Sequence, residues 1–394
     1  MIKANKTCTC CCACVNVCPK NAINLKKDIY GFQYPEIDTT KCIGCNLCNE
    51  VCPDVNPISL LQPKVAYAAT NNDKEIQKES TSAGVFTMLA RNVLLNNGVV
   101  YGCAYDDSFA VRHIVVDKIN NLNKLQKSKY IQSDIDYIYK DVYAFLKKGV
   151  FVLFSGTPCQ IAGLRKYLVK DYPNLLLVDL ICHGVSNNDI FKAFLHEFEN
   201  NNKVKVKGFD FRFKDPFLGN YLTRIVTDKK EYIYPWQCTS YGYLYMMSYI
   251  TRDSCYYCKY SCLNRVGDIS LGDYWNVKKY HPSLDDCFGV SLVLINTDKG
   301  MKAFDGIKNN MKCEETCLDY CLQSNSSLRS QPKMPLNRTV LMDLIAKNDY
   351  KLVEEYYRKI AHDRNRIRLI FSLKRNLLGD LYNFLKIVFH KFFA

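Results

Sequence analysis

The sequence predicts an α/β protein, α+β overall, in which a small cysteine-rich module precedes a layered α/β body and a helical tail. Three observations predict this order. Cysteines recur at fixed offsets between residues 8 and 52, strand and helix patterns alternate from about residue 64, and the last residues are basic and apolar. The expected parts are 1–60, 64–200, 201–340 and 341–394.

The module contains two runs of cysteines with one shared spacing. Each run is spaced C-x2-C-x2-C-x3-C and is followed by proline, which is the pattern that bacterial two-cluster ferredoxins use to bind 4Fe-4S clusters. Because the fourth cysteine of each run ligates the other cluster, the ligand sets should cross. The predicted sets are Cys8, Cys11, Cys14 and Cys52 for one cluster, and Cys42, Cys45, Cys48 and Cys18 for the other.

Zinc is the alternative metal for these cysteines. Zinc sites usually combine two C-x2-C pairs, often with histidine, and would have no use for the proline-terminated repeat. Cys10 and Cys12 stand where ferredoxin motifs usually carry small residues, often glycine. We interpret these two as free thiols beside a cluster, and they leave open which neighbouring sulfur binds iron.

The composition predicts a cytoplasmic globular protein. Of its 394 residues, 48% are hydrophobic and 23% are charged, which is ordinary for a globular chain. The 21 cysteines fall into metal-ligand patterns rather than a small disulfide scaffold, and the opening MIKANK leads into no apolar stretch, so we expect no signal peptide. No run of 18 apolar residues occurs in the sequence, so we expect no membrane span.

The chain is basic, with a formal net charge of +14 when every cysteine is counted as neutral. A 4Fe-4S cluster with four thiolates carries about −2 when oxidised, so three clusters would leave the protein at about +8. A basic surface suits an acidic electron carrier or an anionic cofactor. We therefore expect a ferredoxin or a similar carrier as a partner, and we find no nucleic-acid-binding motif.

From residue 64 the pattern alternates between strands and helices. Because several of the strands are apolar on both faces, we expect a layered sheet that helices cover. Ser80 or Ser82 should cap the first helix, with Gly98 just past its end. Strands are expected at 64–70, 98–106, 110–117, 150–156 and 175–181, and helices at 80–98, 134–149 and 160–168.

The second half of the body should be more antiparallel. Its strands are expected at 204–213, 222–227, 268–275 and 289–297, in an α+β part packed on the first. From about residue 298 the chain should turn helical. Three cysteines there recur every four residues, which we interpret as one stripe on a helix that packs in the core. They are Cys313, Cys317 and Cys321.

The tail alternates basic and apolar residues. This pattern predicts one or two amphipathic helices that lie on an anionic membrane surface or on a partner, so that the protein would be peripheral at the inner membrane surface. A helix packed on the body is the alternative. The basic residues are Arg364, Arg366, Arg368, Lys374 and Arg375.

Four cysteines of the body could form a third site. Cys159 and Cys182 each follow a buried strand, so they can face each other across the crevice in which open α/β sheets bind ligands. Cys255 and Cys258 form a C-x2-C pair, and together the four thiolates suffice for a third 4Fe-4S cluster. Cys262 is available as a substitute ligand. Buried structural thiols are the alternative interpretation of Cys159 and Cys182.

Other polar residues stand beside these cysteines. Gly156 and Thr157 lie between a strand and a helix, where free backbone N–H groups and the helix dipole can receive an anion. His183 follows Cys182 and is a candidate catalytic proton donor. A histidine beside a cluster ligand is more often an orienting hydrogen-bond donor, which is the alternative.

Five motifs resemble one known family, in the same order along the chain. The chain resembles the family of coenzyme F420 hydrogenase/dehydrogenase beta subunits, fused to an N-terminal two-cluster ferredoxin, up to about residue 340. Similar bacterial members occur with surface-polysaccharide genes and have no settled substrate. The motifs are STSAGVFT, SKYIQSD, SGTPCQIAGLRKYL, ICHGV and a C-x2-C pair followed by RVGDISLGDYW.

The resemblance implies an iron-sulfur flavoprotein oxidoreductase with FAD in the α/β body beside a cluster. Cysteines 159, 182, 255 and 258 match the inner-cluster positions of the family, and Ala83 stands where the family usually has the first glycine of S-G-G. The positions that match its flavin side are Thr81, Ser82, Ala83, Gly84, Thr87, Lys129, Tyr130 and Gln132.

Electrons would then pass from a ferredoxin-type donor through the clusters and FAD to an organic acceptor, such as a deazaflavin or a polysaccharide-related substrate. A flavin suits this task because clusters move single electrons, whereas such substrates take two. Two other functions stay open. One is a non-catalytic electron-transfer subunit of a larger redox complex, and the other is a cysteine-rich scaffold that binds polysaccharide-synthesis proteins.

Overall fold

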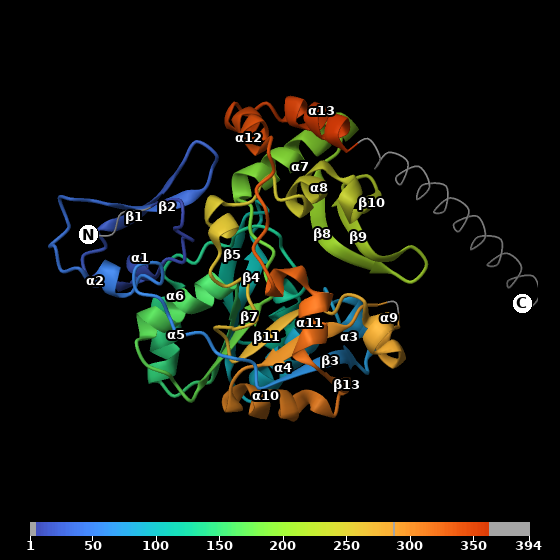
Figure 1. The fold of residues 1–394 in the computed structure, drawn as a ribbon. Helices are drawn as coiled ribbons and strands as arrows, with labels where there is room; N and C mark the ends of the chain where they lie inside the picture. The colour runs from blue at the N-terminus through green and yellow to red at the C-terminus, as the bar shows by residue number, and fades with distance from the viewer. Residues whose placement is uncertain (1–4, 287, 362–394) are drawn as a thin grey trace, which may run out of the picture.

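The computed structural model describes residues 5–286 and 288–361 and is organised around a mixed eight-stranded sheet (Figure 1). The strand order is β13-β3-β12-β11-β7-β6-β4-β5. The strands are β3 (Val65–Asn71), β4 (Val99–Tyr105), β5 (Val111–Val116), β6 (Val152–Gly156), β7 (Leu175–Leu180), β11 (Ile269–Asp273), β12 (Ser291–Ile295) and β13 (Met311–Thr316).

The centre of this sheet is parallel. Strands β4, β6, β7 and β11 run side by side in one direction, with Phe154 of β6 opposite Leu177 of β7. Strands β6 and β7 are buried on both faces, as their unbroken apolar runs predict. Because parallel strands end at the same edge, the segments that follow β6 and β7 emerge next to each other.

Helices cover both faces of the sheet. On one face Val152 and Phe154 pack with residues of α5 (Ile138–Lys147) and α6 (Pro158–Leu168). On the other face Leu153 packs with residues of α4 (Val85–Leu95) and α10 (Asp298–Lys308). This alternation along β6 follows from the two-residue period of a strand.

A second, three-stranded antiparallel sheet packs with four helices around an aromatic core. In Figure 1 this part lies beside the main sheet, with the last two helices over it. Its elements are α7 (Asn188–Asn202), β8 (Val206–Asp215), β9 (Gly219–Thr227), β10 (Glu231–Pro235), α8 (Ser240–Met246), α12 (Arg338–Ala346) and α13 (Tyr350–Ile360).

The cysteine-rich module packs directly on the body. Figure 1 shows it in blue beside α5 and α6. Its residues Ala13 and Val15 belong to the same hydrophobic cluster as Ile161 and Leu164 of α6, so the module and the body share one core. The elements of the module are α1 (Ala13–Val17), β1 (Ile23–Lys27), β2 (Gln33–Ile37) and α2 (Leu47–Glu50).

Shorter elements complete the described chain. Three are α-helices, and the others are short 3-10 helices of three to seven residues. The α-helices are α3 (Lys74–Lys78), α9 (Val277–Tyr280) and α11 (Leu318–Ser324), and the 3-10 helices are η1 (Ile119–Leu125), η2 (Trp236–Cys238), η3 (Asp253–Tyr257), η4 (Pro282–Leu284) and η5 (Ser326–Leu328).

Three expectations about the elements were wrong. Helix α4 begins after Gly84, whose φ of +86° favours glycine, so neither Ser80 nor Ser82 is its N-cap. Strands β11 and β12 form as expected but lie within the main sheet, where β12 pairs with β3. The cysteine stripe is also broken, because Cys313 lies on β13 whereas Cys317 caps α11 and Cys321 lies within it.

The basic tail from residue 362 onward lies outside the described residues. The prediction of a membrane-surface or partner contact falls on those residues. Within the described chain, no helix combines the length and the apolar character needed to cross a bilayer.

Candidate metal centre

Two hollows in the module are each lined by four cysteines of the repeated runs. Each hollow takes three cysteines from one run and the fourth from the other, which is the crossing that the spacing predicts. Which thiolate binds which iron stays a prediction. The first hollow is lined by Cys18, Cys42, Cys45 and Cys48, and the second by Cys8, Cys11, Cys14 and Cys52 together with Cys10 and Cys12.

Left-handed backbone turns wrap each loop around its hollow. In the second run these turns fall on Gly44 and Asn46, with φ of 68° and 62°, two residue types that accept this conformation readily. In the first run the equivalent turns fall on Cys10 and Cys12, with φ of 52° and 62°. A side chain there costs roughly 1–2 kcal/mol, so the two extra cysteines are held in strained positions.

The thiols of the second hollow are buried against one another. Burial raises the pKa of Cys8 to about 11. Burial and the neighbouring Cys14 and Cys8 raise the pKa of Cys11 well above its ordinary value. Such thiols become thiolates only beside positive charge, which the iron of a cluster supplies, so the donor set fits a 4Fe-4S cluster.

A site for one metal ion differs from a 4Fe-4S site in how its ligands are placed. In residues 5–286 and 288–361, no group of three or more His, Cys, Asp or Glu side chains is placed so that it could hold a metal ion. A 4Fe-4S cluster instead uses four thiolates on four irons.

The four cysteines of the body lie together at the end of the central strands. Burial raises the pKa of Cys182 well above its ordinary value, and the next causes are the nearby Cys255, Cys159 and Cys258. Cys159 lies in the first turn of α6, directly after β6, and its Sγ is 3.2 Å from Thr157 Oγ1. The structure thus brings together the four thiols that the sequence singled out, here called the inner set.

A glycine lets the two halves of the inner set approach. Gly184 has a φ of +140°, and a Cβ atom there would lie 2.7 Å from Cγ2 of Thr251 and 3.7 Å from Sγ of Cys255. Only glycine fits this close approach without displacing its neighbours. The loop after β7 therefore packs directly against the turn that carries Cys255.

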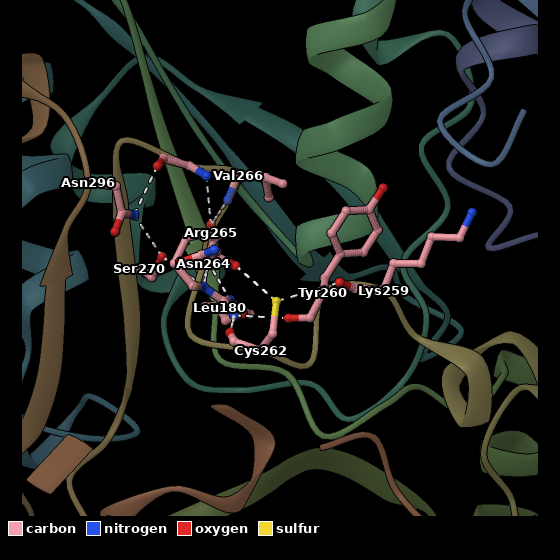
Figure 2. Close-up of polar contacts among 11 residues, drawn as sticks. Leu180, Lys259, Tyr260, Cys262, Asn264, Arg265, Val266, Ser270 and Asn296 are labelled. Carbon is pink, nitrogen blue, oxygen red and sulfur yellow. Dashed lines mark hydrogen bonds and ion pairs between the residues drawn. The ribbon is translucent and has the colours of Figure 1, made fainter. Parts of the chain in front are cut away.

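Cys262 makes its hydrogen bonds within its own loop, although it lies near enough to Cys258 for that thiol to contribute to its raised pKa. Figure 2 shows its sulfur beside the segment that contains Asn264, and the thiol lies 3.3 Å from the Asn264 carbonyl oxygen and 3.6 Å from that of Lys259. These contacts give the thiol two local hydrogen-bond acceptors. Cys262 is accordingly a matched comparison for the four cysteines of the inner set.

A buried ion pair between Arg265 and Asp179 anchors the loop that carries Cys255 and Cys258. Arg265 Nη2 lies 2.6 Å from Asp179 Oδ1 of β7, and both side chains are almost fully buried. Arg265 also donates to the carbonyl oxygens of Leu180, Tyr260 and Cys262. The pair therefore ties the loop to the strand that leads to Cys182.

The inner set and the second hollow meet at α6. A Cβ atom on Gly163 would lie 2.9 Å from Cβ and 3.0 Å from Sγ of Cys11. Cys159 also contributes to the raised pKa of Cys11, although burial and Cys14 contribute more. The Cys11 side chain of the module thus packs on the helix that carries Cys159.

We predict that Gly163→Ala disturbs this contact. The added methyl group must push Cys11 or α6, and such overpacking costs roughly 1–3 kcal/mol. The expected result is a lower free energy of unfolding and loss of iron from the full-length protein, measured by urea titration and iron analysis. Gly306→Ala is the control, because this exposed glycine of α10 has space for a methyl group and should gain up to about 1 kcal/mol. Equal behaviour of the two variants would contradict the prediction.

His183 is held by its surroundings. Its Nε2 lies 3.1 Å from Ser248 Oγ, and its ring contacts that of Tyr245. Burial lowers the pKa of His183, while hydrogen bonds with the backbone of Tyr245 and Met246 oppose this change. These contacts favour an orienting role beside Cys182 over proton donation.

The anion site expected at the start of α6 is not available at Thr157. The Thr157 N–H donates to Gln160 Oε1 at 3.0 Å, as part of a capping box. A Cβ atom on Gly156 would lie 3.1 Å from the same oxygen. The backbone N–H of Thr157 therefore caps its own helix and is not free for a ligand.

The residues that match the flavin side of the family form a segment before and within α4. Thr81 Oγ1 accepts a hydrogen bond from the N–H of Ser128, which connects this segment to the next motif. The Ser82 carbonyl accepts one from Lys214. The N–H of Ala83 donates to Ser291 Oγ, and Thr87 Oγ1 accepts from Gln126, while Gly84 caps α4.

The side chains of the K-Y-x-Q stretch, residues 129–132, contact two different parts of the structure. Lys129 Nζ donates to the carbonyls of Lys124 and Gln126, and the Tyr130 hydroxyl accepts from Arg212 at 2.9 Å. Gln132 lies elsewhere, since its Nε2 donates to the Thr9 carbonyl of the module. The structure thus keeps Lys129 and Tyr130 on the body but places Gln132 at its contact with the module.

Buried basic side chains and unpaired polar atoms lie in the region of Ser82, whose carbonyl accepts from Lys214. Burial lowers the pKa of Lys214 to about 7. Within the described residues, Ser82 Oγ, Asn71 Nδ2 and Arg212 Nε are buried without a hydrogen-bond partner. Unsatisfied donors beside buried basic side chains fit an anionic cofactor, which would complete their hydrogen bonds and favour the charged form of Lys214.

Comparison with known families places these sites in two regions. Residues 151–319 match the family described as the C terminus of the beta subunit in coenzyme F420 hydrogenase/dehydrogenase. That match covers less than half of the chain. Residues 7–55 match the 4Fe-4S dicluster domain, so the protein is an iron-sulfur protein. The beta subunit region contains the whole inner set, and the dicluster region contains both hollows.

Two relatives are named as redox proteins that use coenzyme F420. The coenzyme F420-dependent sulfite reductase of Methanocaldococcus jannaschii is 30% identical over 166 residues, which are 40% of this chain and 25% of that protein. The chain thus spans about a quarter of that relative. The F subunit of the F(420)H(2) dehydrogenase of Methanosarcina mazei is 20% identical over 334 residues, which are 78% of this chain and 84% of the relative.

A solved structure of the F420-reducing [NiFe] hydrogenase complex from Methanosarcina barkeri also contains a similar chain. It is 19% identical and covers 75% of this chain and 93% of that one, with a TM-score of 0.45. Together the families and the relatives show an iron-sulfur protein related to the subunits of F420 oxidoreductases.

Proposed function

We propose that this protein is an iron-sulfur flavoprotein oxidoreductase that passes electrons from a ferredoxin-type donor, through three 4Fe-4S clusters and FAD, to an organic acceptor. The acceptor would be a deazaflavin, as the names of the relatives suggest, or a substrate of surface-polysaccharide synthesis. The dicluster region would receive electrons, and the beta subunit region would deliver them.

The observation that carries this proposal is the row of three cysteine sets. The first hollow includes the exposed Cys45, the second hollow includes Cys11, and Cys11 packs on the helix of Cys159 in the inner set. The first two sets lie in one module and share its two cysteine runs, and the second set contacts the helix of the inner set. Each set therefore neighbours the next. Such a row supports stepwise movement of single electrons from the surface into the body.

The proposed flavin site is the region around Ser82. Lys214 and Arg212 would hold the diphosphate of FAD. Asn71 Nδ2 would donate, and Ser82 Oγ would donate or accept, the hydrogen bonds that they lack in the described chain. When bound, a flavin supplies the exchange between one-electron and two-electron chemistry. The chain's own part is to bind the flavin and to orient it.

Anaerobic purification of the full-length protein tests this function. We expect about twelve irons and an equal amount of sulfide per chain, as three 4Fe-4S clusters require, together with bound FAD. Iron and sulfide analysis and the flavin absorption spectrum measure these quantities. Iron without flavin would contradict the enzyme and leave an electron-transfer protein, whereas zinc without sulfide would contradict both.

A non-catalytic subunit is the second candidate. One relative that covers most of the chain is named as a subunit of a dehydrogenase. In that case the three cysteine sets would connect a redox partner protein to a reaction that occurs elsewhere. Reduction of a deazaflavin by the purified single chain would exclude this second function.

A further inference from the structure

Arg252 connects the module to the loop of the inner set. Its backbone lies directly before η3 (Asp253–Tyr257), and its carbonyl accepts a hydrogen bond from the N–H of Cys255. Its side chain is 1% exposed and enters the module. One buried cation therefore lies where the second hollow and the inner set come together.

The guanidinium is fixed by hydrogen bonds and aromatic rings. Nε donates to the Cys8 carbonyl at 3.0 Å, and Nη2 donates to that of Gln33 at 2.8 Å. Nη1 donates at 3.1 Å to Gln132 Oε1, whose own amide donates to Thr9. The guanidinium carbon lies 4.3 Å from the ring centre of Tyr34. These contacts fix the position of the charge.

What Arg252 lacks is a carboxylate. Among the described residues, the other buried arginines each form an ion pair with an aspartate, whereas Arg252 forms none. An arginine remains charged in proteins, and a buried charge without a counter-charge costs several kcal/mol. The paired arginines are Arg212, Arg265 and Arg338.

The negative charge that would balance Arg252 is that of cysteine thiolates bound to a cluster. Its charge interacts most strongly with Cys10, and it also acts on the thiols of Cys8 in the second hollow and of Cys159 and Cys255 in the inner set. A 4Fe-4S cluster with four thiolates carries about −2 when oxidised and gains one further negative charge on reduction. A fixed cation between two such clusters would favour the reduced state of both.

We propose that Arg252 is the shared counter-charge of the cluster in the second hollow and the cluster of the inner set, and that it raises the reduction potentials of both. The proposal rests on the proposed function, because it needs both clusters. Arg252 is a positioning residue in this role: it binds no iron, but its charge sets how readily each cluster accepts an electron. The hydrogen bonds to Cys8 and Gln33 keep that charge in place.

The test compares Arg252→Gln, which removes the charge, with Arg252→Lys, which keeps it. Each full-length protein is purified without oxygen, its iron is counted, and its clusters are titrated with reductant while electron paramagnetic resonance is recorded. For Arg252→Gln we expect the equilibrium constant for reduction of both clusters to fall about tenfold, a shift of about 59 mV to lower potential. Arg252→Lys should restore most of this shift.

Arg338→Gln is the matched control, since it also removes a buried arginine next to the same turn, but one whose counter-charge is Asp253. It should leave both potentials unchanged. Unchanged potentials in a fully loaded Arg252→Gln, or an equal shift in Arg338→Gln, would overturn the proposal. If Arg252→Gln loses iron, retention of iron and potentials by Arg252→Lys supports the role of charge, and loss of iron in both overturns it. Absence of clusters from the unmodified protein would instead reject the proposed function.

Discussion

Replacing Cys159 or Cys258 with serine is expected to remove about four irons from the full-length protein, which is the iron content of one 4Fe-4S cluster. Both thiols belong to the inner set, in which each cysteine lies close enough to affect the charge of the others. Three thiolates hold a 4Fe-4S cluster poorly. The dicluster region should keep about eight irons, because its eight cysteines line separate hollows.

The same variants should reduce a bound flavin far more slowly from a reduced ferredoxin, measured by anaerobic stopped-flow absorption. Cys262→Ser is the control. Its thiol contacts only carbonyls of its own loop among the described hydrogen bonds, so iron and rates should match those of the unmodified protein. Iron loss in Cys262→Ser alone would show that Cys262 is the ligand in place of one of the four.

Asp179→Asn is expected to lower the free energy of unfolding by about 3–5 kcal/mol, the usual effect of removing one partner of a buried ion pair. Asp179 is fully buried and pairs with Arg265, and its second oxygen accepts from the N–H of Gly267 at 2.7 Å. An unpaired Arg265 would also release the loop of Cys255 and Cys258. Urea titration without oxygen measures the stability, and iron analysis measures the release.

Glu36→Gln is the matched control for this effect. Glu36 pairs with Lys26 on the surface, where the two side chains are 61% and 70% exposed. Exposed ion pairs contribute roughly 0–1 kcal/mol, so this variant should be nearly as stable as the unmodified protein. A loss in Asp179→Asn no larger than in Glu36→Gln would mean that the buried pair does not anchor the loop.

The crossing of the cysteine runs could be predicted because the signal is local and repeated. Each loop must wrap around its own hollow, and this requirement fixes the spacing within about ten residues of sequence. The predicted inner set was also brought together in the structure. The sequence signal for this set was weaker, because Cys159 and Cys255 meet only when β6, β7 and η3 pack together. The family resemblance selected these positions.

Sheet order could not be read from the strands. Strand β12 is buried along its whole length and β11 along its first three residues, and such burial does not reveal which strand lies alongside. They therefore fit equally well in a separate antiparallel part, as expected from the sequence, or within the main sheet, as observed. Long-range pairing with β3 and β7 decides between these arrangements.

The burial of Arg252 and Arg265 could not be predicted from the sequence, although Arg265 opens the RVGDISLGDYW motif. Arg252 and Arg265 lie in polar loops, where an arginine is ordinarily solvated. Their burial depends on partners far away in the chain, such as Cys8 for Arg252 and Asp179 for Arg265. The local feature that the two arginines share is their closeness in sequence to the C-x2-C pair.

The shared core of module and body also bears on how fast electrons can travel. Since Ala13 and Val15 are packed with Ile161 and Leu164, the module does not need to swing on a tether to bring its clusters to the body. The separation between neighbouring cysteine sets is then fixed by packing rather than by diffusion. Transfer inside the protein should accordingly be insensitive to solvent viscosity, and only the arrival of the external electron carrier should slow in a viscous medium.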